Sequence, residues 1–326
     1  MTPQVSIVIV SFNTRDLLRE CLQSLYERTP DIAKEIFVVD NCSRDGSADM
    51  VRQEFPAVCL IRSQVNLGFA AANNKAFPLA TGRYVVLLNS DAFLHSDALQ
   101  RAVQYMDADR HIGLGGARLV GRDGSWQPSA RMFPSLLNEF LTLSGLAARY
   151  PHSRFFGRFD RTWANPDEPA DVDWIPGAFS IVPRSALVQV GYFDEDFFLY
   201  YEEVDLCRRL KKAGFLIRYW PDVTVVHLGG ESSKTVKALT FSKSGSQLTL
   251  WQLRSCLLFY RKHHGLSAWT LKQMESAWHA LRAWKNRGAA DPEKARKFED
   301  AKVYLKLIRQ AWRETAGGMV SPARPW

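Results

Sequence analysis

The stretch VVLLNSDAFL, residues 85–94, is a short run of β-branched and aliphatic residues that passes into three small polar residues. A run of this length bounded by polar residues is typical of a strand buried on both faces of a sheet. Asn89, Ser90 and Asp91 stand at its carboxyl end, the edge at which open α/β sheets bind their ligands. The stretch predicts a core strand and a candidate site, in which Asp91 either holds a metal ion or caps the next helix.

Three further runs of this kind come earlier in the chain: VSIVIVSF (5–12), EIFVVDN (35–41) and AVCLIRS (57–63). The segments between them, and FAAANNKAFPLA (69–80), have the length and apolar spacing of helices. This alternation predicts an α/β fold with a mainly parallel, Rossmann-like sheet and helices on both faces. Since right-handed crossovers bring the strand ends to one edge, we expect four polar clusters to meet in one crevice: Ser11, Phe12 and Asn13; Asp40 and Asn41; Asn66 and Gly68; and Asn89, Ser90 and Asp91.

Beyond residue 112 the pattern is less regular. WIPGAFSIVPRSAL (174–187) indicates a strand leading into a helix, and residues 193–215 indicate a loop followed by an amphipathic helix. IRYWPDVTVVHLGG (217–230) indicates a strand that includes His227 near its end, and the remainder has helical periodicity. We therefore expect an α/β domain over 1–235, with halves 1–112 and 113–235, and a helical extension over 236–326.

The composition favours a cytoplasmic protein. No apolar run in the 326 residues is long enough to span a membrane. The opening MTPQVSIVIV lacks the basic start of a secretory signal. The five cysteines show no C-x-x-C spacing, which favours free thiols in a reducing compartment.

The positive charge is concentrated in the extension. From residue 241 onward there are 16 lysines and arginines against 6 acidic residues, which leaves 26 against 28 in residues 1–240. A helix over 299–316 would place Lys302, Lys306, Arg309 and Arg313 apart from an apolar face made of Val303, Tyr304, Leu307, Ile308, Ala311 and Trp312. Such a helix either lies on an anionic membrane surface or packs on its own chain or on a second subunit. Its acids and apolar face argue against nucleic-acid binding.

Three acids, Glu202, Glu203 and Asp205, stand near the start of the helix expected within 193–215. Acids there stabilise the helix dipole, so a structural role is open. Crowded carboxylates also raise one another's pKa, which suits a general base. Asp91 and His227 are candidates for a hard divalent cation that takes its other ligands from substrate phosphates.

Asp40, Gly68 and Asn73 are each open to two interpretations. Asp40 either accepts hydrogen bonds from a nucleotide or starts a turn, and NLGFAAANN (66–74) either approaches a ligand or forms a glycine turn before a well-packed helix. The chain has no P-loop or G-x-G-x-x-G fingerprint at this place, which disfavours an ATPase or a simple dehydrogenase.

Seven segments in this order resemble the inverting family-2 glycosyltransferases of the GT-A fold, and among them the bacterial rhamnosyltransferases of O-antigen and other surface polysaccharides. The segments are VSIVIVSFN, VVDNCSRDGS, NLGFAAANN, LLNSDA, WIPGAFSIVPRSAL, FFLYYEEVDLCRRLKKAG and VVHLGGESS. NSD (89–91) stands where the family has its D-x-D motif, with Asn89 in place of the first acid. Glu203 matches the second acid of the family's E-D pair, which is its catalytic base.

The resemblance implies a role for each candidate residue. The nucleotide-sugar donor would be bound by Ser11, Phe12, Asn13, Asp40, Asn66, Gly68, Asn73, Asn89, Ser90 and Asp91, in the nucleotide-binding half 1–112. The acceptor would be bound in the half 113–235 by Trp174, Gly177 and Ala178. Asp91 and His227 would bind Mg²⁺ or Mn²⁺, and Glu203, or else Asp205 or Glu202, would be the base.

The resemblance also implies partners and a location. The donor would be dTDP-rhamnose or a UDP-sugar, and the acceptor a polyprenyl-diphosphate-linked glycan. The basic extension would then rest on the inner face of the plasma membrane, with a homodimer possible and no nucleic-acid partner. Two alternatives compete: a non-catalytic binding subunit of a polysaccharide assembly complex, and a nucleotidyltransferase. The nucleotidyltransferase is disfavoured because SFNTRDLL (11–18) lacks the glycines such enzymes have after the first strand.

Overall fold

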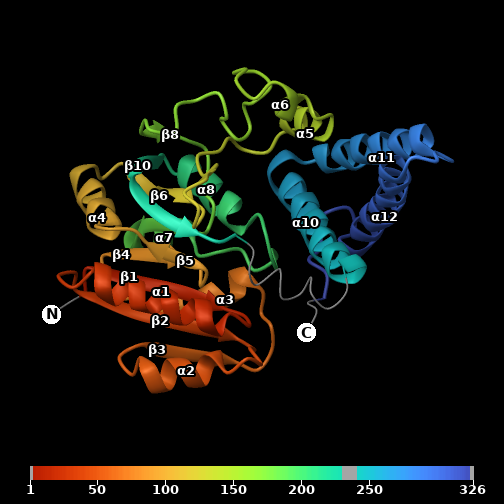
Figure 1. Cartoon of the computed structure of the whole chain (residues 1–326). Coiled ribbons are helices and arrows are strands. Elements are labelled where there is room, and N and C mark those ends of the chain that lie inside the picture. Colours follow the sequence, from red (N-terminus) through yellow and green to blue (C-terminus); the bar gives the residue numbers. More distant parts are fainter. Residues whose placement is uncertain (1–2, 230–240, 324–326) are drawn as a thin grey trace.

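The computed structural model describes residues 3–229 and 241–323, and within these ten strands form a single sheet (Figure 1). The main order of strands is β3-β2-β1-β4-β9-β6-β10-β5, with β7 paired to β6 and β8 to β10. The strands are β1 (Val5–Ser11), β2 (Lys34–Asn41), β3 (Cys59–Ser63), β4 (Tyr84–Leu88), β5 (Ala92–Leu94), β6 (Ile112–Val120), β7 (Trp126–Gln127), β8 (Ala170–Asp171), β9 (Phe179–Pro183) and β10 (Leu216–His227).

The first four long strands are those that the sequence predicts, and they are parallel. β1 pairs with β2 and with β4, and β2 pairs with β3. The registers place Ser11 beside Asp40, and Asn41 beside Ser63. The carboxyl ends of these strands therefore lie at one edge, as expected for parallel strands joined by helical crossovers.

The second half of the sheet is mixed. β9 lies antiparallel to both β4 and β6, whereas β6 and β10 are parallel to each other and β5 is antiparallel to β10. The parallel sheet expected from the sequence thus continues into a half in which β9 reverses the direction. This reversal brings the turn before β9 to the carboxyl end of β4, where Asn89 N–H donates to Ala178 O at 3.1 Å.

Helices cover both faces of the sheet, as predicted. On β1, Val5, Ile7 and Ile9 belong to one core cluster and Val8 to the other, following the two-residue alternation of a strand. One cluster includes apolar residues of α1 (Arg15–Arg28), α2 (Ser47–Glu54) and α4 (Ala98–Ala108). The other includes residues of α3 (Phe69–Ala76), α7 (Arg184–Val190) and α8 (Glu202–Lys212). A short 3₁₀ turn, η1 (Phe77–Leu79), follows α3, and α5 (Leu136–Leu143) and α6 (Leu146–Arg149) lie in the connection between β7 and β8.

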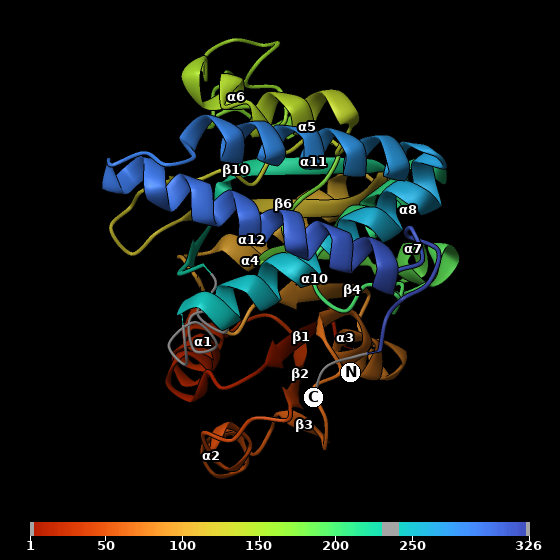
Figure 2. The ribbon, with the colours of Figure 1, turned by 90° about the vertical axis from the view of Figure 1, so that its right-hand side faces the viewer.

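The C-terminal part is helical, as the sequence predicts. Helices α10 (Phe241–His264), α11 (Ser267–Asn286) and α12 (Pro292–Glu314) lie beside one another, away from the α1 and α2 side of the sheet (Figures 1 and 2). Phe259 of α10 packs on Tyr201, which precedes α8, with ring centroids 5.4 Å apart. The predicted domain boundary at 235/236 lies outside the described residues.

Of the two alternatives for the helix at 299–316, the structure shows packing on its own chain. Leu307, Ile308 and Ala311 of α12 are buried, and Tyr304 and Trp312 pack against the same core. Only Val303 of this expected apolar face is exposed. The face is therefore occupied and does not contact a membrane. Among the described helices none is both long and apolar enough to cross a bilayer.

Candidate active site

The carboxyl ends of β1 and β4 are joined by a chain of buried hydroxyl groups. Thr14 Oγ1 lies 3.1 Å from Ser11 Oγ and donates to Ser90 Oγ at 2.9 Å. All three residues are buried, because two strand ends meet here. Ser11 and Ser90, both predicted to bind the donor, are thus linked through Thr14 and hold the carboxyl ends of β1 and β4 together. The sequence analysis did not identify Thr14 as a residue of the site.

Asn13 and Asp40 form the next part of the edge. Asn13 adopts a left-handed φ of 54°, its N–H donates to Ser43 Oγ at 3.0 Å, and its Oδ1 accepts from Arg44 N–H at 2.8 Å. Burial raises the pKa of Asp40, and hydrogen bonds from Ser43 act in the opposite direction. Asp40 Oδ1 is buried and has no hydrogen-bond partner among the described residues. A buried carboxylate oxygen without a partner is costly, so Asp40 is well suited to receive a donor group of a ligand. Phe12, next to Asn13, is partly exposed at the same strand end.

A turn is formed by Asn41, Asn66 and Gly68, which make their hydrogen bonds to one another. Asn41 Nδ2 donates to Asn66 Oδ1 at 2.9 Å, and Asn66 Oδ1 also accepts from Gly68 N–H at 3.0 Å. Gly68 has a φ of +80°, and a Cβ there would lie 2.2 Å from Phe198 O. The structure therefore explains the glycine by the close approach of the 193–201 loop.

Asn73, predicted to bind the donor, lies inside α3. Its side-chain amide donates to Phe69 O at 2.9 Å, four residues earlier in the same helix, and only 1% of the residue is exposed. The structure thus gives Asn73 a place in the helix packing instead of one at the crevice.

Asp91 and His227 come together at the edge, as predicted. Asp91 Oδ1 lies 3.5 Å from His227 Nε2, and Asn89 Nδ2 is also 3.5 Å from this nitrogen. Gln127 fixes the ring: its Nε2 donates to His227 O at 2.8 Å, which turns its Oε1 to His227 Nδ1 at 3.1 Å. With Nδ1–H directed at Gln127, the lone pair of Nε2 faces Asn89 Nδ2 and Asp91, and this tautomer is the form that binds metals.

The side chains of Asp91 and His227 fit a divalent cation that takes its remaining ligands from a bound substrate. No group of three or more His, Cys, Asp or Glu side chains with metal-binding geometry occurs among the residues that the structure describes. Asp91 and His227 supply one carboxylate and one imidazole, a set suited to Mn²⁺ or Mg²⁺ when a diphosphate provides further oxygen ligands.

Glu202 and Glu203 begin α8 and form a coupled pair of acids. Only 3% of Glu202 is exposed, and burial together with the charge of Glu203 raises the pKa of Glu202 well above its usual value. Burial also raises the pKa of Glu203, but hydrogen bonding from Glu202, from the Gly177 backbone and from its own backbone opposes this rise. The pKa of Glu202 is thus raised further than that of Glu203, so Glu203 is the acid of the pair that loses its proton more readily.

Glu203 lies beside the turn that touches the carboxyl end of β4. A Cβ on Gly177 would lie 3.9 Å from Glu203 Oε1, and the next residue, Ala178, accepts the hydrogen bond from Asn89 N–H. The turn 177–178 therefore connects the acid on α8 to the Asn89–Asp91 segment. Since Gly177 is partly exposed, the turn borders open space.

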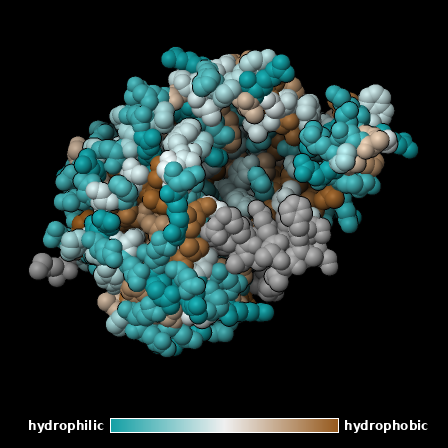
Figure 3. All heavy atoms as spheres, viewed as in Figure 1, coloured by the Kyte–Doolittle hydropathy of each residue, from teal (hydrophilic) through white to brown (hydrophobic). Residues whose placement is uncertain are grey.

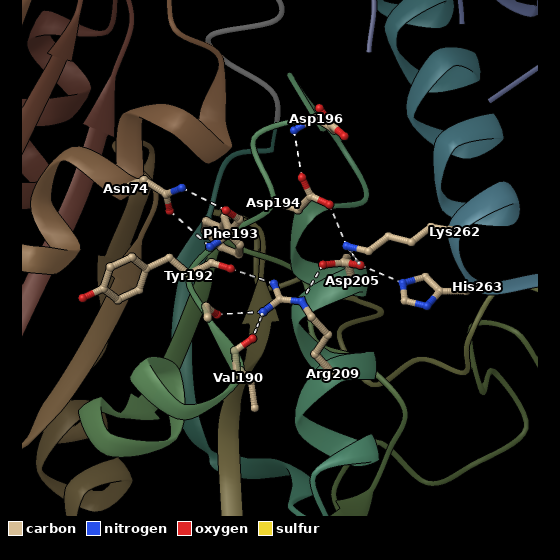
Figure 4. Close-up of polar contacts among 11 residues, drawn as sticks. Asn74, Val190, Tyr192, Phe193, Asp194, Asp196, Asp205, Arg209, Lys262 and His263 are labelled. Carbon is tan, nitrogen blue, oxygen red and sulfur yellow. Dashed lines mark hydrogen bonds and ion pairs between the residues drawn. The ribbon is translucent and has the colours of Figure 1, made fainter. Parts of the chain in front are cut away.

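Asp205, the alternative base, is fully committed to ion pairs (Figure 4). Its Oδ2 accepts from Arg209 Nε at 2.7 Å, and its Oδ1 lies 2.7 Å from both Lys262 Nζ and His263 Nε2 of α10. Despite burial, these partners hold the pKa of Asp205 far below its usual value. A carboxylate of this kind is a poor proton acceptor near neutrality, so the interpretation of Asp205 as the base is not supported by the structure.

The same cluster connects the C-terminal extension to the half of the domain made of residues 113–235. Arg209 also donates to the backbone oxygens of Val190, Gly191 and Tyr192 at 2.7–2.8 Å, and Lys262 bonds to Asp194 at 2.6 Å (Figure 4). Figure 3 shows a hollow between the sheet and the C-terminal helices. The position of α10 beside α8 is thus fixed by buried charges and not by apolar packing alone.

The residues predicted to bind the acceptor differ in their accessibility. Trp174 and Ala178 are buried, and Trp174 Nε1 donates to Met132 O at 2.8 Å, with Arg131 stacked 5.1 Å from the ring centroid. These contacts give Trp174 a packing role. Of the three, only Gly177 is partly exposed.

Several residues of the site carry no sequence signal. Gln127 and Lys262 stand in segments without a motif, and each reaches its partner only through the fold. The hydroxyl of Thr14 is equally ordinary in sequence. Motifs consist of residues that are close along the chain, whereas these three residues contact partners more than 50 positions away.

Comparisons with known proteins indicate one family for this chain. Residues 6–165 match the family model of glycosyl transferase family 2. Over 238 residues the chain is 30% identical to the N-acetylglucosaminyl-diphospho-decaprenol L-rhamnosyltransferase of Mycobacterium tuberculosis, which covers 70% of this chain and 76% of that protein. Over 289 residues it is 26% identical to the rhamnosyltransferase WbbL of Escherichia coli, covering 84% and 99% of the two chains.

Among solved structures, the chain is similar to the mannosyltransferase PcManGT of Pyrobaculum calidifontis in complex with GDP-Man and Mn²⁺. The TM-score is 0.51 and the sequence identity 19%, over 97% of this chain and 76% of that one. At this identity the likeness shows the fold alone, and the fold is GT-A, as the sequence predicts.

Proposed function

The chain belongs to glycosyl transferase family 2, and from this premise we propose that it transfers L-rhamnose from dTDP-rhamnose to a hydroxyl group of a glycan acceptor, with inversion at the anomeric carbon. That the chain is a glycosyltransferase follows from the family. The choice of rhamnose is supported by the two relatives named as rhamnosyltransferases, in Mycobacterium tuberculosis and in Escherichia coli.

One observation carries the proposal: the turn 177–178 lies between Glu203 and the segment that includes Asp91, and contacts both. Asp91 lies at the carboxyl end of β4 with His227, and Glu203 lies across the turn at the start of α8. A displacement at a sugar carbon needs a group at the leaving phosphates and a base for the incoming hydroxyl. The two acids supply these two functions from different elements.

Glu203 is the proposed base. It takes the proton from the acceptor hydroxyl, while the pKa of Glu202 is raised further than that of Glu203 and makes Glu202 the weaker candidate. Burial keeps the pKa of Glu203 above that of an exposed glutamate, which suits proton transfer near neutral pH. A positioned base of this kind accelerates a reaction by about 10²–10⁴-fold.

Asp91 and His227 would hold a Mg²⁺ or Mn²⁺ ion with the donor. Such an ion neutralises the charge that develops on a departing nucleoside diphosphate. The structure supports this role because Gln127 orients the His227 ring, with Nε2 toward Asp91. The Mn²⁺ in the complex of the similar mannosyltransferase is in keeping with a divalent ion.

The nucleotide would lie over Phe12, Asn13 and Asp40, where the unpartnered Asp40 Oδ1 accepts a hydrogen bond from the ribose or the base. The acceptor would be a polyprenyl-diphosphate-linked glycan, because the relative in Mycobacterium tuberculosis is named for one. Since a polyprenyl chain is held in the bilayer, we expect the enzyme at the inner face of the plasma membrane.

The test is a transfer assay with purified protein and a synthetic N-acetylglucosaminyl diphosphate carrying a short alkyl chain. dTDP-rhamnose, UDP-glucose and GDP-mannose are compared, each with Mn²⁺ and with EDTA. We expect a product with dTDP-rhamnose that depends on Mn²⁺. Product with only another donor would refute the choice of rhamnose. Donor binding without either transfer or hydrolysis would favour a non-catalytic binding subunit and refute the proposed reaction.

A further inference from the structure

Helix α11 presents an uncharged, largely apolar face to solvent. Trp269, Leu281 and Trp284 are 55%, 54% and 75% exposed, and Leu266 just before the helix is 76% exposed. The other exposed positions of α11 are threonine, glutamine and alanine, with one lysine, Lys285, at the border of this face. The opposite side, with Ala268 and Leu271, packs into the protein. Solvent-facing helices usually carry charges on their outer face, so an outer face of this composition calls for a partner.

A basic groove lies next to this face, between α11 and α12. The groove has a volume of about 730 Å³ and is lined by five cations, with a leucine and a tryptophan of α12 between them: Lys272, Lys302, Lys306, Arg309 and Arg313. Lys302 pairs with Glu299 at 3.1 Å. Lys306, Arg309 and Arg313 form no ion pair with any residue in the described part of the chain. The groove is therefore strongly positive and complementary to an anionic surface.

The apolar face and the groove are neighbours. Trp269 and Lys272 are three residues apart on α11 and so lie on adjacent parts of the helix surface, and Lys272 lines the groove. Figure 2 shows α11 and α12 side by side on the side of the molecule turned to the viewer, in front of the sheet. Exposed tryptophans beside unpaired cations are the pattern of a surface that inserts rings at the level of lipid headgroups.

We propose that the outer face of α11, with the basic groove of α12, docks the enzyme on an anionic phospholipid bilayer. The tryptophans and leucines enter the interface between headgroups and acyl chains, and Lys306, Arg309 and Arg313 contact lipid phosphates. The inference deepens the proposed function, since it rests on an acceptor held in a membrane. It assigns the contact to α11, whereas the sequence pattern had pointed to the apolar face of α12, which is buried.

The charge distribution supports a lipid surface over a second copy of this chain. The groove is positive, and a second copy would present the same positive groove across a symmetric contact, which is repulsive. Residues 1–240 have nearly balanced charge, so this part of a second copy carries no large net negative charge to offset the groove. A negatively charged leaflet attracts each nearby lysine or arginine.

The experiment is sedimentation of the full chain with sucrose-loaded vesicles of phosphatidylcholine, with or without phosphatidylglycerol. We expect binding only with phosphatidylglycerol, and weaker binding as salt rises. Trp269→Ala with Trp284→Ala should weaken binding about tenfold or more, through lost burial of the rings. Lys306→Glu, Arg309→Glu and Arg313→Glu together should weaken it at least about 100-fold, at roughly 1 kcal/mol for each cation.

The matched control is a triple reversal of exposed cations on the sheet domain, Arg28→Glu, Lys75→Glu and Arg110→Glu, which changes the net charge equally. It should bind within about threefold of the natural sequence, because these residues belong to α1, α3 and the loop after α4 and not to α11 or α12. Equal loss in the control and in the α12 variant would overturn the proposal, as would no binding of the natural sequence. A dimer, seen by light scattering, that the tryptophan variant dissociates would make the face a subunit interface and would also overturn it.

Catalysis is measured separately, with the short-chain acceptor in the absence of vesicles. The docking variants should retain transfer under these conditions, because none of their residues belongs to the site. If the natural sequence binds vesicles but transfers nothing, the proposed function fails and the docking face stands. If transfer occurs but no vesicle binding is found, the docking face fails alone.

Discussion

Asp91 Oδ1 and His227 Nε2 lie 3.5 Å apart, although Asp91 follows β4 and His227 ends β10. The antiparallel pairing of β10 with β5 sets this distance, with His227 directly opposite Ala92. Asp91 is the last residue of the turn before β5, so the register of β5 with β10 places it beside His227.

We expect Asp91→Ala to lower transfer about a thousandfold, because charge stabilisation by a held cation is worth several kcal/mol. Calorimetry should show that Mn²⁺ no longer strengthens binding of dTDP. Ser96→Ala, on the solvent side beyond β5, serves as a control and should leave both quantities unchanged. Turnover close to normal in Asp91→Ala would show that this carboxylate does not hold the ion.

Gln127→Ala should weaken Mn²⁺ binding by about 10–100-fold, since partners that orient a metal-binding histidine have effects of this size. The reason is the pair of contacts that Gln127 makes with His227, one to the ring and one to the backbone. Titration of Mn²⁺ in the presence of dTDP measures the effect. Gln127→Glu keeps an acceptor for Nδ1–H and should lose less, and an equal loss in both variants would contradict the orienting role.

Glu203→Gln should lower kcat by about 10²–10⁴-fold while the Kd of the donor stays unchanged. A base must be deprotonated, so in the natural enzyme kcat should fall as pH drops through the pKa of Glu203, which burial raises above the usual 4.5. This acid limb should be missing from the residual activity of Glu203→Gln. If the limb persisted in that variant, another group would be the base.

Asp205→Asn should lower the free energy of unfolding at pH 7 by about 3–5 kcal/mol, the usual effect of breaking a buried ion pair. Its partners Arg209, Lys262 and His263 would lose the shared carboxylate. Because the folded-state pKa of Asp205 is lowered, its contribution is present above about pH 4 and is lost as pH falls through that lowered pKa. Urea unfolding at several pH values measures this.

The same variant separates a structural role from a catalytic one. In the folded fraction, Asp205→Asn should turn over within about tenfold of the natural enzyme, well short of the loss that removing a base produces. A loss of kcat as large as that of Glu203→Gln, with the fold intact, would return Asp205 to the list of bases.

Gly68→Ala should destabilise the protein by about 3 kcal/mol or more, since the new Cβ would lie 2.2 Å from Phe198 O and backbone would have to move. Gly145→Ala is the matched control: its φ is also positive, at +74°, but nothing lies within 4 Å of the added Cβ. The control should lose only about 1–2 kcal/mol, the cost of a left-handed conformation. Equal losses would show that the contact with Phe198 is not tight.

Much of the fold follows from periodicity. The four parallel strands, the helix at the acid cluster and the helical extension were all expected from the spacing of apolar residues, because burial on one or both faces imposes that spacing. The reversed direction of β9 was not expected. The apolar pattern of a strand does not indicate its direction in the sheet. The direction of β9 is seen only in its antiparallel pairing with β4 and β6.

The candidate site was also predicted only in part from the sequence. The meeting of Asp40 and Asp91 at one edge follows from parallel strands, and Glu203 was found from the family motif. The sequence could not distinguish which of the three neighbouring acids, Glu202, Glu203 or Asp205, is the best candidate for the base. It depends on Lys262 and His263 of α10, which hold Asp205, and on Gly177, which lies beside Glu203.

The amino-acid sequence by itself determined where the strands and helices form and which polar residues stand at their ends, because those features depend on neighbours along the chain. Tertiary structure alone decided which acid of the 202–205 cluster is held in ion pairs, which nitrogen of His227 is turned to Asp91, and which helix of the extension keeps an apolar face in solvent. The physical reason is that ionisation, tautomer and exposure are set by groups that surround a residue in space, and in this protein those groups come from distant parts of the sequence.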